Sequence, residues 1–486
     1  MTPALTPALF INGQLCAAEN NATFERRNPL DGDIASRAPA ASVADMQRAI
    51  TCAAAAFESW RDAGPGARRA LLLHAAERLE ARCADFVSAM ASETGASAQW
   101  AEFNVHLGAE LLREAAALTT QVSGEVIPSD VPGNLALAVR QPAGVVLGIA
   151  PWNAPVILGV RAIATPLACG NCVVLKGSEL SPATHGLIIA ALNEAGFAPG
   201  VVNFVTNAPE DAAQIVEAAI AHPAVRRVNF TGSTSVGKII AQTCARHLKP
   251  AVLELGGKAP LLVLDDADLD TAVNCAIFGA FANSGQICMS TERIIVDEAI
   301  ADDFVERFAR RASELPCRDP REGPTVLGAV ADSRCVERCN ALIDDALEKG
   351  ARLAVGGKSH SALMAATVLD GITPDMKIYH EEAFGPVKGI VRVRGEAAAI
   401  ACANDNAFGL SSAVFSRDTA RAWRVAQRLQ SGICHINGPT VHDEPQMPFG
   451  GVKASGYGRF GGQAGVQEFT DLRWITLQTA PRPLPF

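Results

Sequence analysis

Short and long hydrophobic runs alternate along residues 144–253 of the chain. The short runs have the length of buried strands, the longer ones have the length of helices, and brief polar loops separate them. We predict strands at 144–150, 172–176, 201–205, 226–230 and 251–253, and helices at 155–167, 182–195, 211–221 and 235–245. This alternation is typical of a parallel sheet with helices on both faces, which binds ligands beyond the carboxyl ends of its strands.

A second alternating region begins near Glu254. It predicts strands at 259–263, 293–296, 413–415 and 433–437, with helices at 269–282 and 300–312. Residues 50–118 are rich in alanine and predict amphipathic helices at 57–79 and 101–118, and one more strand is expected at 470–477. The pattern therefore predicts an α/β fold with two doubly wound domains.

The composition adds an ordinary globular balance to this pattern. Of the 486 residues, 49% are hydrophobic and 19% are charged, and a chain of this length exceeds what one hydrophobic core supports. The net charge of −9 and the lack of a basic run argue against a nucleic-acid partner. Prolines and polar residues interrupt the apolar stretch 143–170, so we expect two buried elements there and no membrane span.

The thirteen cysteines lie at irregular spacing. A chain with large cores does not need a disulfide framework, and the first ten residues lack the features of a secretion signal. Neither Cys169 with Cys172 nor Cys335 with Cys339 has a second ligand pair at zinc-finger spacing, so no metal site is expected. We therefore expect a cytoplasmic protein.

Two residues are candidates for covalent chemistry. Cys288 follows Gly285 and Gln286, which indicate a loop leading the thiol into a site, and a thiol of lowered pKa is a strong nucleophile. A buried, inert cysteine is the alternative. Glu254 stands at the carboxyl end of the strand predicted at 251–253, where it is either a general base or a solvated turn residue.

Polar residues also follow the strands of the first predicted sheet. Asn153 has an amide that suits either an oxyanion donor or a helix N-cap. Lys176 and Glu179 suit the hydroxyls of a ribose, or a surface ion pair, and a carboxylate there favours NAD over NADP because it repels a 2′-phosphate. Gly232 and Ser233 begin a helix whose N-terminus suits phosphate, and the same run approaches a P-loop but lacks the hydroxyl that holds magnesium.

Taken in order and spacing, these segments resemble the aldehyde dehydrogenase superfamily over nearly the whole chain. The matching pieces are Pro151-Trp-Asn153, Lys176-x-x-Glu179, Phe230-Thr-Gly-Ser233, Glu254-Leu-Gly-Gly-Lys258, Gly285-Gln-Ile-Cys288, Glu381-Glu-Ala-Phe-Gly-Pro386 and Pro448-Phe-Gly-Gly451. The resemblance implies an NAD-binding domain at 1–121 and 143–253 and a catalytic domain at 254–465. It also implies a β-arm at 122–142 and 466–486, used to assemble a homodimer or homotetramer.

The resemblance also implies roles for individual residues. Cys288 would attack the aldehyde carbon, Asn153 would hold the oxyanion, and Glu254 would activate the water that hydrolyses the thioester. The cofactor NAD would be bound by Trp152, Lys176, Glu179, Gly232, Ser233, Glu382 and Phe384. Because the CoA-acylating branch of the family typically lacks the glutamate, Glu254 favours a free acid as the product.

Within the family the chain is most similar to the aryl-aldehyde group, which oxidises salicylaldehyde, vanillin and benzaldehyde. The similar segments are 95–106, 287–293 and 435–438. We therefore expect a small aromatic aldehyde as the substrate and its carboxylic acid as the product. An aliphatic aldehyde or a semialdehyde is the alternative.

A set of side chains on the helix that follows the first strand bears on this choice. Ala154, Leu158 and Arg161 share one face, and in the family that helix lines the substrate tunnel. Small Ala154 leaves room for a ring, and Arg161 could donate to a phenolic oxygen or a carboxylate unless it pairs with a structural carboxylate. Trp100 and Phe449 are candidate walls for the ring, or core residues.

Overall fold

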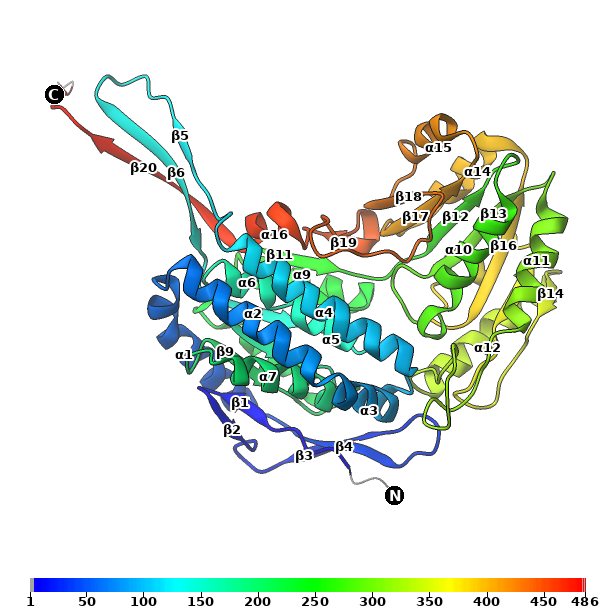
Figure 1. The fold of residues 1–486 in the computed structure, drawn as a ribbon, viewed down its shortest axis with the longest axis horizontal. Coiled ribbons are helices and arrows are strands. Elements are labelled where there is room, and N and C mark those ends of the chain that lie inside the picture. Colours follow the sequence, from blue (N-terminus) through cyan, green and yellow to red (C-terminus); the bar gives the residue numbers. More distant parts are fainter. Residues whose placement is uncertain (1–3, 483, 485) are drawn as a thin grey trace.

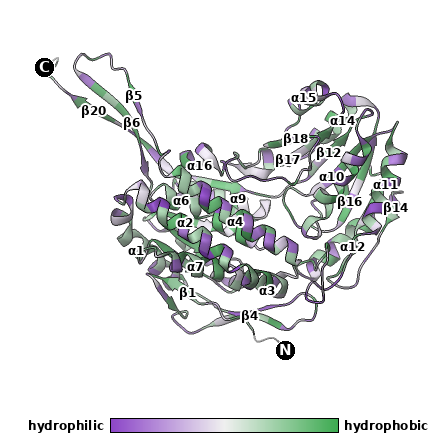
Figure 2. Ribbon diagram, in the orientation of Figure 1, coloured by the Kyte–Doolittle hydropathy of each residue, from purple (hydrophilic) through white to green (hydrophobic). Residues whose placement is uncertain are grey.

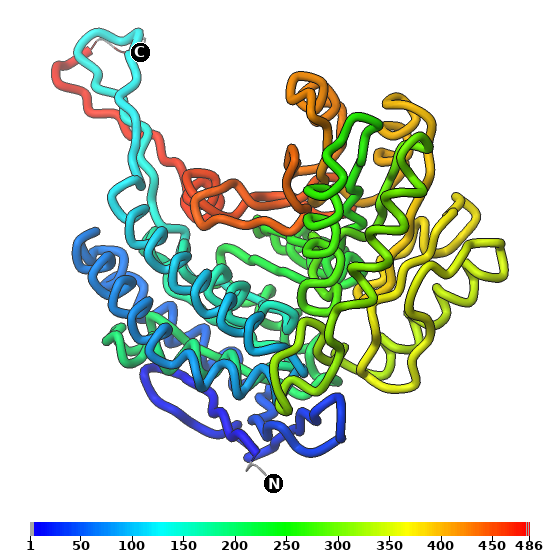
Figure 3. Tube along the Cα trace, turned by 45° about the vertical axis from the view of Figure 1, so that its right-hand side comes forward, coloured from blue at the N-terminus to red at the C-terminus, as the bar shows by residue number. Residues whose placement is uncertain are grey.

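The computed structural model describes residues 4–482, 484 and 486. Two large sheets with helices packed on them form the body, and a narrow arm that contains the last strand projects from it (Figures 1 and 3). Parallel strands form the centre of both large sheets. The predicted fold of two doubly wound α/β domains with a small β-arm is confirmed.

The first sheet has the strand order β19-β11-β10-β7-β8-β9-β1-β2. Strands β11, β10, β7, β8 and β9 run parallel, whereas β19 and β1 pair antiparallel at the two sides. The bounds are β1 Leu9–Ile11, β2 Gln14–Cys16, β7 Val145–Ile149, β8 Cys172–Lys176, β9 Val202–Val205, β10 Val225–Thr231, β11 Ala251–Glu254 and β19 Gly456–Tyr457. Every residue of β7, β8 and β9 is buried, as expected for strands covered on both faces.

The helices around this sheet form two groups. Helix α8 contacts both α1 and α9, and α5, α6 and α7 contact α2, α3 and α4. The bounds are α1 Val43–Arg61, α2 Pro65–Ala81, α3 Cys83–Thr94, α4 Ala98–Leu118, α5 Pro155–Arg161, α6 Ala164–Ala168, α7 Pro182–Ala195, η1 Pro209–Asp211, α8 Ala212–Ala221 and α9 Thr234–Arg246. The groups give the sheet the two helical layers that the alternating pattern predicts.

Two helices predicted as continuous are each broken in the structure. The helix expected at 57–79 is two helices, because the chain turns at 62–64 and Pro65 begins α2. Proline disfavours a helical conformation of the residue before it, and Gly64 is extended there. The helix expected at 155–167 is also two, because Pro166 has no N–H and its ring would clash with the carbonyl of residue 162 in a continuous helix.

The second sheet has the strand order β14-β15-β16-β13-β12-β17-β18, parallel except at β14. The strand bounds are β12 Ala259–Val263, β13 Thr291–Asp297, β14 Arg352–Val355, β15 Thr367–Asp370, β16 Val387–Val393, β17 Ser411–Phe415 and β18 Ile433–Ile436. The helix bounds are α10 Leu269–Phe281, η2 Ala282–Gly285, α11 Ala301–Ser313, α12 Ser333–Glu348, α13 Lys377–His380, α14 Gly395–Asn404, α15 Thr419–Ala426, η3 Lys453–Ser455 and α16 Gly462–Glu468. Strands β14 to β16 were not predicted, and β14 shows no buried alternation because its residues are exposed or half-buried.

The arm is a three-stranded antiparallel sheet. It consists of β5 Glu125–Ile127, β6 Asn134–Pro142 and β20 Thr470–Gln478, in the order β20-β6-β5. Strand β20 pairs with β6 along its whole length, yet eight of its nine residues are exposed, and apolar positions lie along the arm (Figure 2). A separate hairpin joins β3 Thr23–Arg27 to β4 Ile34–Pro39.

The division of the chain into three sets of ranges stays a prediction. Strand β19 lies in the range expected for the catalytic domain but pairs with β11 of the first sheet. Residues 1–3 of the first range, and 483 and 485 of the arm range, lie outside the described residues. Among the residues that are described, no helix has both the length and the apolar character needed to cross a bilayer.

Candidate active site

A tight turn at residues 283–285 leads to Cys288. The three residues Asn283, Ser284 and Gly285 all have left-handed backbone angles, with φ of 49°, 55° and 74°. A Cβ at Gly285 would lie 2.3 Å from the carbonyl oxygen of Gly385, so the close approach of these two loops requires glycine. Such a conformation persists only where the surroundings impose it, and the loop therefore presents the thiol in one fixed place.

The side chain of Gln286 secures the same loop. Its Oε1 accepts a hydrogen bond from the backbone N–H of Ala331 at 2.9 Å, and its Nε2 donates to the carbonyl of Asn283 at 3.2 Å. The carbonyl of Gln286 in turn accepts from the side-chain amide of Asn153 at 3.0 Å. The turn is thus tied to the end of β7 as well as to the segment before α12.

Asn153 lies beside the thiol and not at a helix cap. Helix α5 begins at Pro155 with Ala154 as its N-cap residue, so the capping alternative for Asn153 does not hold. The backbone carbonyl of Asn153 accepts from the indole of Trp100 at 3.0 Å. These bonds fix the amide of Asn153 at the wall that it shares with Cys288.

Glu254 ends β11 and is almost wholly buried. Neither of its carboxylate oxygens has a hydrogen-bond partner among the described residues. Burial raises the pKa of Glu254 to about 8, and the nearby charge of Arg161 limits that rise. A carboxylate in this condition is a strong base once it is ionised.

The thiol of Cys288 is held in its protonated form. Burial raises its pKa well above the ordinary value, the negative charges of Glu254 and Glu382 add to the rise, and Arg161 opposes it. Because the thiolate is the reactive form, the thiol needs a base to act as a nucleophile. Glu254 lies close enough that each of the two groups shifts the pKa of the other.

Two cavities meet at Cys288 and Asn153. The first has a volume of about 520 Å³ and is lined by five of the predicted cofactor residues, namely Trp152, Gly232, Ser233, Glu382 and Phe384. The rings of Trp152 and Phe384 contact edge to face, with their centroids 5.8 Å apart. The wall also includes residues that no motif indicated, among them Cys335 and Arg338 of α12.

The two remaining cofactor candidates lie apart from this wall. Lys176 is the last residue of β8, and Glu179 follows three residues later and forms an ion pair with it. Asn207 donates to the Glu179 carboxylate at 3.0 Å. Their neighbour Leu180 lines the cavity, but neither of them does. The structure therefore places this pair at the carboxyl edge of the sheet, next to the cavity.

Buried charges hold the loop that carries Glu382 and Phe384. The carboxylate of Glu292 accepts hydrogen bonds from the backbone N–H groups of Ala383 at 2.9 Å and Phe384 at 3.3 Å. The ammonium groups of Lys258 and Lys388 contact the same carboxylate at 2.9 and 3.0 Å. Burial alone would raise the pKa of Glu292, but the two lysines hold it down to about 2.

Sequence reasoning missed this network. The carboxylate and its two lysines come from different strands or loops. Lys258 and Glu292 each fell within a segment that had been singled out, but nothing in the sequence paired them with each other or with Lys388. Glu382 itself is positioned by the backbone N–H of Gly257, which donates to it at 2.9 Å. Burial raises the pKa of Glu382 to about 7.

The second cavity has a volume of about 320 Å³ and contains all five predicted substrate residues. These are Trp100, Ala154, Leu158, Arg161 and Phe449. The ring of Trp100 stacks on that of Phe103 with their centroids 5.5 Å apart. Most of the remaining wall is aliphatic or aromatic, so the cavity suits an apolar group.

Arg161 both lines the second cavity and pairs with a carboxylate. Its guanidinium forms an ion pair with Asp443 and lies over the ring of Phe449, 4.3 Å from the centroid. The alternative that Arg161 has a carboxylate partner is therefore correct. Asp443 follows β18 in an irregular segment, and no sequence signal indicated it.

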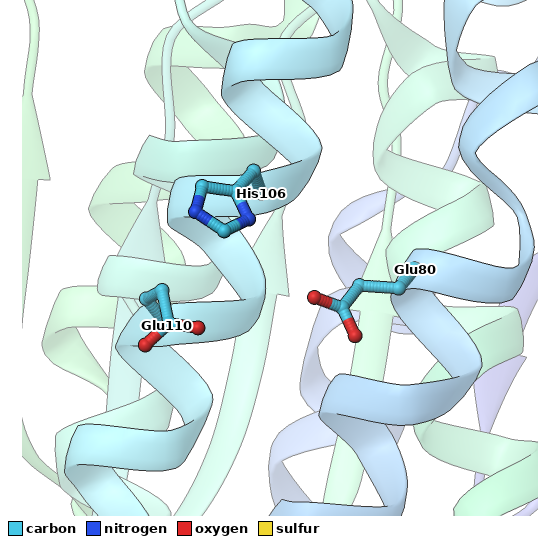
Figure 4. A group of neighbouring side chains, drawn as sticks. All are labelled: Glu80, His106 and Glu110. Carbon is cyan, nitrogen blue, oxygen red and sulfur yellow. The ribbon is translucent and has the colours of Figure 1, made fainter.

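One group outside these cavities has the residue types of a metal site. Glu80 projects from α2 towards His106 and Glu110 on α4 (Figure 4), and their candidate ligand atoms lie within 4.8 Å of one another. The guanidinium of Arg113 donates to Glu80 at 2.9 Å and to Glu110 at 2.7 Å. Because Arg113 already forms ion pairs with both carboxylates, the group is a surface ion-pair cluster.

One thiol is reached from two cavities, which is the arrangement that an enzyme needs to bring two small molecules to one reactive group. The chain belongs to the aldehyde dehydrogenase family, whose model matches residues 16–475. It is an oxidoreductase of that type, and the predicted family is confirmed.

Individual relatives are similar over nearly their whole length. A vanillin dehydrogenase from Pseudomonas fluorescens is 61% identical over 98% of this chain and 99% of its own. The crystal structure of a salicylaldehyde dehydrogenase from Pseudomonas putida G7 complexed with salicylaldehyde is 48% identical, with a TM-score of 0.98 over 99% of this chain and 100% of that one. The structure of PnpE in complex with nicotinamide adenine dinucleotide is 33% identical, with a TM-score of 0.94 over 99% of each chain. The predicted similarity to aryl-aldehyde dehydrogenases is confirmed.

Proposed function

We propose that this enzyme oxidises an aromatic aldehyde to its carboxylic acid with NAD as the oxidant. The observation that carries the proposal is the meeting of two cavities at Cys288 and Asn153, one of them walled by aromatic and aliphatic side chains. The similarity to a vanillin and a salicylaldehyde dehydrogenase supports the choice of an aromatic substrate.

In this proposal the sulfur of Cys288 adds to the aldehyde carbon. The thiol proton leaves to a base as the carbon–sulfur bond forms, and the carbonyl oxygen becomes an oxyanion. The amide of Asn153 has one N–H bonded to Gln286, which leaves the other to donate to that oxyanion, together with the backbone N–H of Cys288. These two N–H donors would stabilise the negative charge on the oxygen as it develops.

The residues of the first cavity fit a dinucleotide. Ser233 caps the N-terminus of α9, where free backbone N–H groups favour a phosphate, and a Cβ at Gly232 would lie 2.4 Å from the ring of Phe230. The carboxylate of Glu382 suits the ribose hydroxyls next to the nicotinamide, with Phe384 packing beside it, and Trp152 forms part of the same wall. When bound, NAD supplies the two-electron acceptor that turns the adduct on Cys288 into a thioester.

Lys176 and Glu179 would hold the other ribose of the cofactor. They lie beside the cavity at the end of β8, and Glu179 is anchored by Asn207. A carboxylate at this place accepts a hydrogen bond from a 2′-hydroxyl and repels a 2′-phosphate, which supports NAD over NADP.

Glu254 would complete the reaction by activating water. Its two unpartnered carboxylate oxygens are free to take a proton from a water molecule that attacks the thioester carbon. The products are then the free acid and the Cys288 thiol. This role explains why a carboxylate is buried without a protein donor next to the nucleophile.

The substrate ring would lie in the second cavity. Trp100 and Phe449 offer aromatic faces, and Ala154 and Leu158 leave the floor apolar. The test is NADH formation by the purified enzyme with benzaldehyde, salicylaldehyde, vanillin, hexanal and succinic semialdehyde. A kcat/KM that is at least about tenfold higher for the aromatic aldehydes, or about 1.4 kcal/mol, supports the proposal, and a preference for either of the others contradicts it.

We further propose that the arm joins subunits in a homodimer or homotetramer. The exposed side chains of Leu472, Trp474 and Leu477 on β20 support this, because a two-faced exposed strand is stabilised by pairing with another chain. Light scattering on the intact enzyme and on a Trp474→Lys variant would test it.

We also propose a cytoplasmic location, which the thirteen unpaired cysteines support. We assign residues 1–121 and 143–253 to cofactor binding and residues 254–465 to catalysis.

A further inference from the structure

The substrate cavity contains one buried ion pair in an otherwise apolar wall. Among the described residues that line it, Arg161 and Asp443 carry full charges, and their side chains are only 5% and 8% exposed. Two other titratable side chains line the cavity: Cys288, whose thiol pKa is raised by burial, and His442, which is turned to Glu444 with 3.0 Å between Nε2 and Oε1. The net charge that a substrate ring meets is therefore set by a single pair.

The two members of the pair are not equivalent. Asp443 uses Oδ2 to contact Nη2 of Arg161, and its Oδ1 is sealed from solvent without a partner. The guanidinium of Arg161 lies over the ring of Phe449. Its other nitrogens have no hydrogen-bond partner among the described residues, and none of them is sealed from solvent. Those nitrogens are therefore the open donors of the pair, whereas Asp443 acts mainly by its charge.

We propose that Asp443 determines the charge selectivity of the substrate cavity. By neutralising Arg161 it lets an uncharged aromatic aldehyde enter without leaving a buried cation unpaired, and it repels an aldehyde that carries a second, anionic group. This inference rests on the proposed function of the same cavity. It also explains how an arginine can line a cavity for uncharged aromatic aldehydes without making that cavity selective for aldehydes that carry a carboxylate.

The physical reason lies in the low polarity of the cavity. A charge pair in such surroundings interacts strongly, and removing one partner leaves the other uncompensated. An arginine freed from Asp443 would gain most from a carboxylate on the substrate, which would replace the lost partner and satisfy the same donors in bidentate geometry. The selectivity would then shift towards anionic aldehydes.

The experiment compares benzaldehyde with 4-formylbenzoate, which adds a carboxylate to the same ring. Four proteins are needed: the parent enzyme, Asp443→Asn, Arg161→Gln and the double variant. Glu444→Gln is the matched control, because it removes the neighbouring acidic charge, which is exposed and lies outside the cavity wall. The quantity measured is the ratio of kcat/KM for 4-formylbenzoate to kcat/KM for benzaldehyde.

We expect Asp443→Asn to raise this ratio at least tenfold, Arg161→Gln to lower it, and the double variant to return towards the parent value. Glu444→Gln should leave it unchanged. An unchanged ratio in Asp443→Asn, or an equal rise in Glu444→Gln, overturns the proposal. If Asp443→Asn does not fold, Arg161→Gln decides, since a rise there contradicts the account and a fall supports it.

A second readout separates charge from packing. The charged and titratable groups that act on Glu254 are Arg161, Cys288, Asp443 and Arg459. Removing the negative charge of Asp443 should therefore move the pH dependence of thioester hydrolysis to lower pH, and an unmoved profile counts against the proposal. If the parent enzyme oxidises none of the three aromatic aldehydes, the proposed function fails. The same ratio measured with succinic semialdehyde and butanal then still tests Asp443.

Discussion

The two cavities that meet at Cys288 are built in different ways. The cofactor side is a set of backbone arrangements: a helix N-terminus at Ser233, glycines that permit close approach at Gly232 and Gly256, and a loop clamped by Glu292. The substrate side is a set of ordinary apolar side chains around one ion pair. Backbone geometry restricts which residue types fit, so the cofactor side can be recognised in the sequence. The side chains of the substrate side can be exchanged one by one without disturbing the fold.

The largest effect is expected at the junction of the two sides. Cys288→Ala removes the nucleophile, so aldehyde oxidation should fall by roughly 10⁴-fold or more, as for other nucleophile deletions. The cofactor side should be untouched, and NAD binding followed by quenching of protein fluorescence should keep its affinity. Substantial oxidation by this variant would contradict the role of Cys288.

Glu254→Gln should separate the two halves of the reaction. The amide cannot take a proton from water, so hydrolysis should slow by about 10²- to 10⁴-fold. Adduct formation should slow less, and rapid mixing should show a burst of NADH equal to the enzyme present, followed by slow turnover. Slow NADH formation without a burst would show that Glu254 acts earlier, on the thiol.

Glu292→Gln tests the clamp behind the cofactor side. It leaves Lys258 and Lys388 buried without their carboxylate, which should cost about 3–5 kcal/mol of stability in chemical denaturation. In the protein that remains folded, the KM for NAD should rise more than the KM for the aldehyde. The exposed pair of Glu298 with Arg394 gives the control, because Glu298→Gln should change neither quantity measurably.

The pH dependence of hydrolysis follows from the raised pKa of Glu254. The ionised carboxylate is the base, so the rate should rise with pH, about tenfold per unit below a pKa near 8, and level off above it. Single-turnover decay of a preformed acyl enzyme measures this step alone. A decay rate that is flat between neutral pH and pH 9 would mean that Glu254 is ionised throughout or is not the base.

The smallest effect is expected on the substrate side. Ala154→Val adds two methyl groups to the wall beside Asn153, so kcat/KM for benzaldehyde should fall by about tenfold relative to acetaldehyde, which needs less room. Because the two aldehydes are compared on one protein, a loss of folded enzyme cancels from the ratio. An unchanged ratio would place the ring elsewhere.

Most of the fold could be predicted because the elements have sharp local ends. Pro182 and Gly196 mark the two ends of α7, and β8 and β12 are apolar runs that each begin directly after a polar residue, so their predicted and observed bounds agree. The break before Pro65 was overlooked because alanine-rich periodicity continues across it, and the break near Pro166 because the apolar run continues across it. Strand β14 is too exposed to show a pattern.

The residues of the site likewise fall into those with a local sequence signal and those without one. Cys288, Glu254 and Asn153 follow glycine-rich or strand-end segments, and they lie together as predicted. Asp443 and Glu292 could not be found in this way, because each acts through a partner that lies more than thirty residues away in the sequence. Charge pairs across such separations leave no local pattern, although they determine how the recognisable residues are held.

The central claim is that oxidation passes through a thioester on Cys288. The most direct test is intact-protein mass spectrometry of Glu254→Gln, quenched in acid soon after mixing with NAD and benzaldehyde. The account predicts a mass increase of one benzoyl group, located on Cys288 by peptide mapping and lost when NAD is left out. An enzyme that forms NADH while carrying no acyl group on Cys288 would contradict the account.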